Sequence, residues 1–171
     1  MGSAKRFRSA PECYASALAI EHEAARRYRE FAELLEDHGD RRTAALLREL
    51  AHFQEERVAA LLTRSKGLAL PQLEAWRYSW IDDAPPDKVA HELVYHLMTP
   101  HDALAIALGA ERRAAAFFRQ VGADAEDAGL ARLAAEIVEE DEHQIARIEE
   151  AIARVPRPFR YGEDYEAFVM R

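Results

Sequence analysis

Residues 139–145 read EEDEHQI, four acidic side chains directly before a histidine. Carboxylate and imidazole groups bind divalent metals, and residues three apart in sequence lie on one face of a helix. Glu140 and His143 have this spacing. The segment is therefore either one edge of a metal site or the solvated face of a charged helix, which is the more common origin of a charge run.

The composition is that of a globular protein of one domain. The chain has 171 residues, of which 49% are hydrophobic and 32% charged, so it has enough apolar side chains for a core. Its formal net charge of −8 argues against binding to nucleic acid or to an anionic membrane surface. No apolar run approaches the roughly 20 residues that a membrane-spanning helix needs.

Cysteine content points to a reducing compartment. Cys13 is the one cysteine, so the chain has no intrachain disulfide and no Cys-x-x-Cys metal motif. The first ten residues, MGSAKRFRSA, are basic but lack the apolar segment of a secretory signal. We therefore expect a cytoplasmic protein.

Strand signals are nearly absent, and Ala, Leu, Glu and Arg dominate, which predicts an all-α fold. We predict helices from Pro11 to about Asp37, from about Arg41 to Ser65, from Thr99-Pro100 to about Val121-Gly122, and from Ala123 or Glu126 to Arg154.

Short loops join the first two helices and the last two, so each pair forms an antiparallel hairpin. A long crossover, about 66–99, joins the hairpins and carries a short helical stretch, DKVAHELVYHLM. This is the connectivity of a ferritin-like four-helix bundle at 11–154. Residues 1–10 are expected to be a flexible N-terminus and 155–171 a C-terminal strap.

The two hairpins resemble each other and read as two copies of one unit. The alignment places Glu21 against Glu111, Tyr28 against Phe118, Gln54 against Glu140, and Arg57 against His143.

Each predicted helix carries polar residues near the middle of its apolar stripe. A carboxylate in such a stripe costs several kcal/mol to desolvate unless it is paired or bound to a cation. We therefore expect Glu140 and His143 to face inward, and Glu139, Asp141 and Glu142 to face solvent. The inward polar residues expected on the other helices are Glu21, Gln54, Arg57 and Glu111.

The segments Glu21-x-x-Ala-x-x-x-Tyr28, TPHDALAIALGAE ending at Glu111, and Glu140-x-x-His143 resemble the rubrerythrin branch of the ferritin-like superfamily. The resemblance covers about residues 12–153. It implies a four-helix bundle with a carboxylate-bridged di-iron centre that reacts with peroxide or dioxygen.

The second helix departs from that pattern. It offers Gln54-x-x-Arg57 where the family has Glu-x-x-His, and a guanidinium has no lone pair for a metal. Ala114 stands where some rubrerythrins carry a further glutamate, and one cysteine excludes a rubredoxin domain. We hypothesise that Arg57 takes the place of one metal and its ligands.

Two functions remain open. In the first, one iron, manganese or zinc ion is bound by Glu21, Gln54, Glu111, Glu140 and His143. With iron and an open position, peroxide or dioxygen reduction with an external electron donor is conceivable, as is iron handling. In the second, there is no metal, Arg57 neutralises the core carboxylates, and the protein is a structural or interaction module. A homodimer is expected in either case.

Other residues have less specific readings. Tyr28 is placed to donate to a ligand or to carry an electron, or it is an ordinary core tyrosine. A different register of the second helix would instead use His52 with Glu55 or Glu56, but it would turn Leu47, Leu50 and Leu61 away from the core. Surface or interface roles are expected for His91, His96, His101, Trp76, Tyr78 and Trp80.

Overall fold

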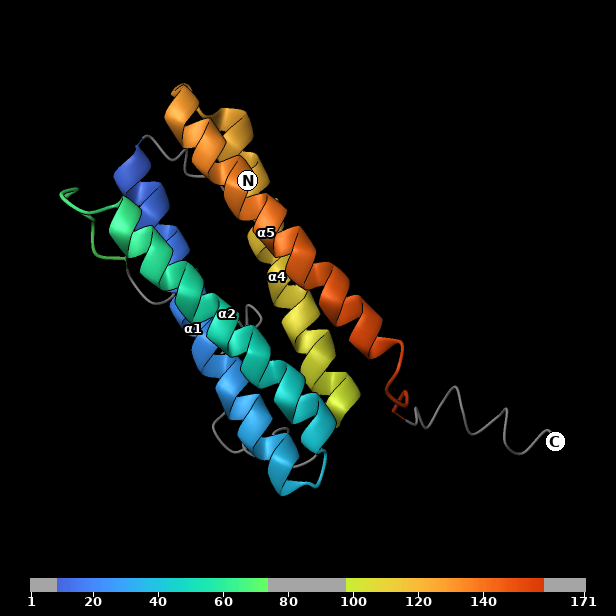
Figure 1. Ribbon diagram of the computed structural model, residues 1–171. Helices are drawn as coiled ribbons and strands as arrows, with labels where there is room; N and C mark the ends of the chain where they lie inside the picture. Colours follow the sequence, from blue (N-terminus) through green and yellow to red (C-terminus); the bar gives the residue numbers. More distant parts are fainter. Residues whose placement is uncertain (1–8, 74–97, 159–171) are drawn as a thin grey trace.

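The computed structural model describes residues 9–73 and 98–158, and it confirms the predicted all-α four-helix bundle (Figure 1). The described residues form α1 (Ala10–Asp37), α2 (Arg41–Arg64), α4 (Pro100–Asp124) and α5 (Ala128–Ile152), with no strand among them. None of these four helices is long and apolar enough to cross a membrane. Residues 1–8, 74–97 and 159–171 lie outside the described residues. They include most of the predicted N-terminus (1–10), crossover (about 66–99) and C-terminal strap (155–171), with Trp76, Tyr78, Trp80, His91 and His96. His101 is described and lies in the first turn of α4.

The helix ends follow local capping chemistry. The side chain of Asp40 accepts a hydrogen bond from the Thr43 backbone N–H, and Thr99 forms a reciprocal capping box with Asp102. The α1–α2 turn passes through Gly39 at a φ of 87°, where a side chain would be strained. The third helix runs two residues past the predicted Gly122, and the fourth begins only after its cap at Asp127.

The α1–α2 and α4–α5 pairs pack as two hairpins, and their inward positions recur at alternating steps of four and three residues. This period of 3.5 residues is that of long helices packed nearly parallel. The buried positions that show it on α2 are Thr43, Leu47, Leu50, Gln54, Arg57 and Leu61. On α5 they are Leu130, Ala134, Ile137, Asp141, Gln144 and Ile148.

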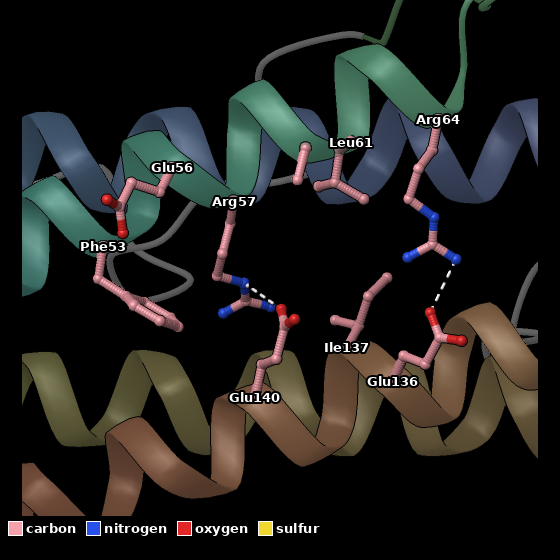
Figure 2. A pocket seen from close by; sticks show the side chains of 9 residues that line it. Phe53, Glu56, Arg57, Leu61, Arg64, Glu136, Ile137 and Glu140 are labelled. Carbon is pink, nitrogen blue, oxygen red and sulfur yellow. Dashed lines mark ion pairs between the residues drawn. The ribbon is translucent and has the colours of Figure 1, made fainter.

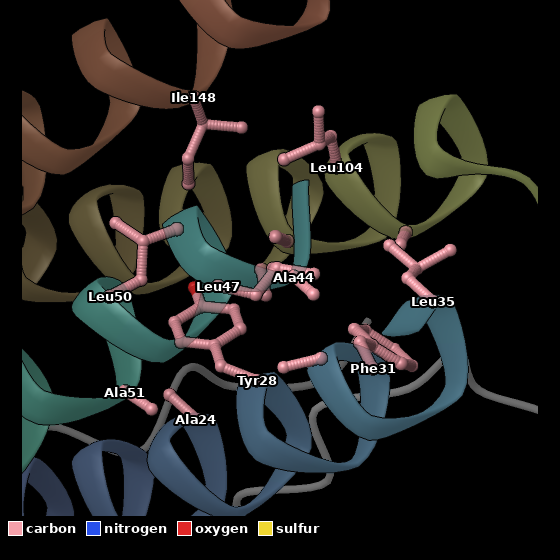
Figure 3. Close-up of a cluster of buried hydrophobic side chains, with 14 of the residues drawn as sticks. Ala24, Tyr28, Phe31, Leu35, Ala44, Leu47, Leu50, Ala51, Leu104 and Ile148 are labelled. Atoms are coloured by element: carbon pink, nitrogen blue, oxygen red, sulfur yellow. The ribbon is translucent and has the colours of Figure 1, made fainter. Parts of the chain in front are cut away.

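The apolar core has two parts. One cluster includes Tyr28, Phe31, Leu47, Leu104 and Ile148, as Figure 3 shows. The other cluster is built around Cys13, Phe118, Leu61, Leu130 and Ile137. Between the residues of these two clusters in sequence, each helix carries at least one buried polar or charged side chain, so the bundle has a polar layer near its middle.

The alternative register of α2 is wrong. Leu47, Leu50 and Leu61 are buried, as the stripe requires. The His52 side chain is 72% exposed and makes an ion-pair contact of 3.3 Å with Glu56 on the surface. Burying three leucines stabilises the fold by more than burying one imidazole would, so α2 adopts the register that buries the leucines.

A buried polar layer around Arg57

Every helix contributes to the polar layer, and each contributing residue is at most 5% exposed. The layer consists of Glu21 and Tyr28 from α1, Gln54 and Arg57 from α2, Glu111 from α4, and Asp141 and Gln144 from α5.

Arg57 lies at the centre of the layer and links three helices. Its Nη1 donates a hydrogen bond of 2.8 Å to Asp141 Oδ1. Its Nη2 lies 2.9 Å from Glu21 Oε1, and its Nε lies 2.8 Å from Glu140 Oε2, both as ion pairs rather than well-aligned hydrogen bonds. The guanidinium also lies 5.8 Å from the centroid of the Phe53 ring. One cation is therefore held by carboxylates from α1 and α5.

Glu111 is held by neutral donors instead of a cation. The Tyr28 hydroxyl donates a short hydrogen bond to Glu111 Oε1, and Gln54 Nε2 donates to the same oxygen over 2.8 Å. Tyr28 therefore has the role of a donor to a core carboxylate. Burial raises the pKa of the Tyr28 phenol well above its usual value, so it remains protonated and keeps donating.

The carboxylates of the layer hold protons more tightly than usual. Burial raises the pKa of Glu111 to about 7, with the Asp141 charge adding to the rise and the Tyr28 hydrogen bond opposing it. Burial raises the pKa of Asp141 to about 6 against the lowering effect of Arg57. Burial also raises the pKa of Glu21 well above its usual value, although Arg57 lowers it. Desolvation therefore exceeds the stabilisation that one guanidinium supplies.

The layer also contains buried acceptors without donors. Gln54 Oε1, Asp141 Oδ2 and Gln144 Oε1 have no hydrogen-bond partner. An unpaired buried acceptor costs about 1–3 kcal/mol. Two donors of Arg57, Nε and Nη2, also lack well-aligned hydrogen bonds and make ion-pair contacts instead. The hydrogen bonding of the layer is therefore incomplete on both the donor and the acceptor side.

The prediction for α5 is wrong by one residue. Asp141 and Gln144 are buried, whereas His143 is exposed and the Glu140 side chain is 50% exposed. Glu140 still reaches Arg57 from the rim of the layer. His143 points away because a step of four residues from Ile137 to Asp141 continues the 4-3 alternation of α5, whereas a step of three to Glu140 breaks it.

The correct alignment of the two hairpins follows from these positions. Glu21 and Glu111 are both buried, in agreement with the predicted pairing. In the second helix of each hairpin, the buried pair Gln54-x-x-Arg57 corresponds to Asp141-x-x-Gln144, and not to Glu140-x-x-His143. Neither copy of this buried pair contains a histidine.

A pocket of about 230 Å³ between α2 and α5 reaches the edge of the layer (Figure 2). Leu61 and Ile137 lie between two ion pairs in it, Arg57 with Glu140 and Arg64 with Glu136 at 2.7 Å. A third pair, Arg147 with Glu49 at 2.9 Å, also links these two helices. The seam between α2 and α5 is thus bridged largely by ion pairs.

The residues present do not fit the di-iron centre that the resemblance implies. Such a centre takes a glutamate from each of two helices and a Glu-x-x-His pair from each of the other two. Glu21 and Glu111 match the first requirement, but neither buried pair of α2 or α5 contains an imidazole. Arg57 also contacts two of the three buried carboxylates. In the described part of the chain, no three His, Cys, Asp or Glu side chains are arranged to hold a metal.

No protein-family model matches the chain, and no curated protein matches it. A crystal structure from Magnetospirillum magnetotacticum MS-1, described as COG1633, an uncharacterized conserved protein, is 32% identical in sequence. The match covers 89% of this chain and 99% of that one, with a TM-score of 0.79. This chain belongs to the COG1633 family.

Proposed function

We propose that this protein is a rubrerythrin-like member of the ferritin-like superfamily that works without a metal, as a structural or protein-interaction module. The observation that carries the proposal is the position of the Arg57 guanidinium, in contact with Glu21 from α1 and Asp141 from α5. A fixed cation between these carboxylates supplies the charge that a metal would otherwise supply, and it has no redox chemistry.

The side chains of the layer argue against peroxide or dioxygen reduction. Its donors are carboxylates, amides and a phenol, and its cation is a guanidinium that keeps its proton. The pKa of Arg57 is raised, because Glu21 and Asp141 together outweigh the lowering effect of burial. The chemistry of this layer is therefore that of a cross-link between helices.

We extend the proposal to the location and assembly of the protein. The only cysteine, Cys13, is buried, and burial raises the pKa of its thiol to about 11, which suits a chain kept reduced in the cytoplasm. We also propose a homodimer, in which Leu62 and Leu68, 51% and 42% exposed, would be tested as interface residues. Light scattering of the purified protein measures the mass that decides between monomer and dimer.

Metal content per chain tests the proposal directly. Protein purified without chelator, after growth with added iron and manganese, is expected to contain far less than one metal per chain by elemental mass spectrometry. It should also keep its thermal midpoint after treatment with chelator. Close to one tightly bound metal per chain, with a lower midpoint after its removal, would overturn the proposal and restore a single-metal function.

A further inference from the structure

The polar layer contains acceptors that its own side chains do not satisfy. Gln54 Oε1 on α2, and Asp141 Oδ2 and Gln144 Oε1 on α5, have no hydrogen-bond partner among the described residues. These side chains are at most 3% exposed, so bulk solvent does not supply the missing donors. Buried oxygens in native proteins are almost always paired, either with other protein groups or with ordered water.

The register of α2 against α5 places these acceptors at one level of the bundle. Ion pairs give that register: Glu49 with Arg147, Arg57 with Glu140, and Arg64 with Glu136. Residue numbers rise along α2 as they fall along α5, so the two helices run side by side in opposite directions. The same register sets Gln54 opposite Gln144, one turn from the hydrogen bond between Arg57 and Asp141. The unpaired oxygens therefore gather at the seam between α2 and α5.

The donors next to these oxygens are directed elsewhere. Gln54 Nε2 donates to Glu111 Oε1, and Arg57 Nη1 donates to Asp141 Oδ1. The other guanidinium donors, Nε and Nη2, make ion-pair contacts without well-aligned hydrogen bonds. Among the described side chains, the layer therefore lacks a group that donates to its amide and carboxylate oxygens and also accepts from Arg57.

Water has both of these properties. A buried water typically makes about three hydrogen bonds to polar groups that would otherwise be unsatisfied, as donor and as acceptor. A second cation would satisfy the oxygens alone, and the guanidinium of Arg57 would repel it. The pocket of about 230 Å³ between α2 and α5 is lined by Arg57, so it has room for water at the edge of the layer.

We propose that the layer is a binding site for internal water, held between Gln54, Asp141 and Gln144 as a fixed part of the fold. One water donates to at most two acceptors, so the three unpaired oxygens take at least two waters. These waters bridge α2 to α5 beside the hydrogen bond from Arg57 to Asp141. The inference rests on the proposed function in one respect, that no metal fills the layer.

Water magnetic relaxation dispersion of the full chain, on protein shown to be free of metal, counts the waters that stay bound for longer than the protein takes to tumble. Gln144→Leu removes one acceptor and gives the site an apolar wall, which favours a dry site. This variant is expected to hold at least one long-lived water fewer than the wild type. Gln120→Leu is the matched control, because Gln120 is an exposed glutamine on α4 that donates to Asp124, and it should keep the wild-type count.

An equal count of long-lived waters in the wild type and in Gln144→Leu would overturn the water site. If that variant does not fold, nuclear Overhauser spectra of the wild type replace it. A cross-peak between a long-lived water and the side-chain amide protons of Gln54 is then expected, and its absence would overturn the site. Metal-free protein without such a water would refute this inference alone, whereas one bound metal per chain would refute the proposed function.

Discussion

Arg57 on α2 and Asp141 on α5 are joined by a hydrogen bond of 2.8 Å, although 84 residues separate them in sequence. The contact connects one helical hairpin to the other across the core. Because Arg57 also contacts Glu21, one side chain ties α1, α2 and α5 together.

Replacement of Arg57 by methionine is expected to destabilise the protein by about 3–5 kcal/mol at pH 7.5, because it leaves buried carboxylates without a cation. Urea unfolding measures the loss. Arg112→Met removes an exposed arginine paired with Glu149 and should cost less than about 1 kcal/mol. An equal loss of unfolding free energy in the two variants would show that the buried contacts of Arg57 stabilise the protein no more than an exposed ion pair does.

Restoration of metal binding should need changes on two helices. Gln54→Glu with Arg57→His rebuilds one Glu-x-x-His pair and is expected to bind about one metal per chain. Two metals should require Asp141→Glu and Gln144→His as well, because the second pair belongs at these positions. Elemental analysis gives the stoichiometry. Two metals in the double variant would mean that Glu140 and His143 act as ligands after all.

Tyr28→Phe is expected to cost about 1–3 kcal/mol, because it removes a donor from buried Glu111. The hydrogen bond favours ionised Glu111, so the cost should be larger at pH 8 than at pH 6. Tyr14→Phe, near Arg64 and away from Glu111, should cost the same at both pH values. Urea unfolding of the wild type and of both variants, measured at pH 6 and at pH 8, decides between these outcomes.

His143→Ala is expected to change stability by less than about 0.5 kcal/mol and to leave metal content unaltered, because the residue is exposed. Gln54→Ala, which removes a donor to Glu111 in the fully buried layer, should cost at least 1 kcal/mol. A loss of stability or of bound metal in His143→Ala would contradict the alignment of α5 derived from burial.

The fold and most of the polar layer follow from local sequence. Leu47, Leu50 and Leu61 fix the buried face of α2 and carry Gln54 and Arg57 inward with them. On α5 no large apolar residue marks the buried face between Ile137 and Ile148, and steps of three or four residues both suit a helix. The 4-3 alternation of buried positions identifies Asp141 and Gln144, whereas the Glu-x-x-His spacing favours Glu140 and His143.

Contacts within the layer could not be predicted in the same way. The ion pairs of Arg57 and the hydrogen bond from Tyr28 to Glu111 join helices far apart in sequence, and side-chain rotamers decide them. The sequence predicts that buried Arg57 pairs with carboxylates, but it does not identify which carboxylates these are. It also gave no sign that Glu111 would be held by Tyr28 and Gln54 while Arg57 takes Glu21 and Asp141.

The position of the polar layer between two apolar clusters also limits how the hairpins can align along the bundle axis. The apolar steps repeat every seven residues, so sliding one hairpin by about 10.5 Å would again bring apolar residues face to face. Such a slide would also place Arg57 against apolar side chains, and Asp141 would lose its hydrogen bond from Arg57. The layer therefore excludes slipped alignments that burial of apolar surface alone would tolerate, as single buried polar residues do in coiled coils.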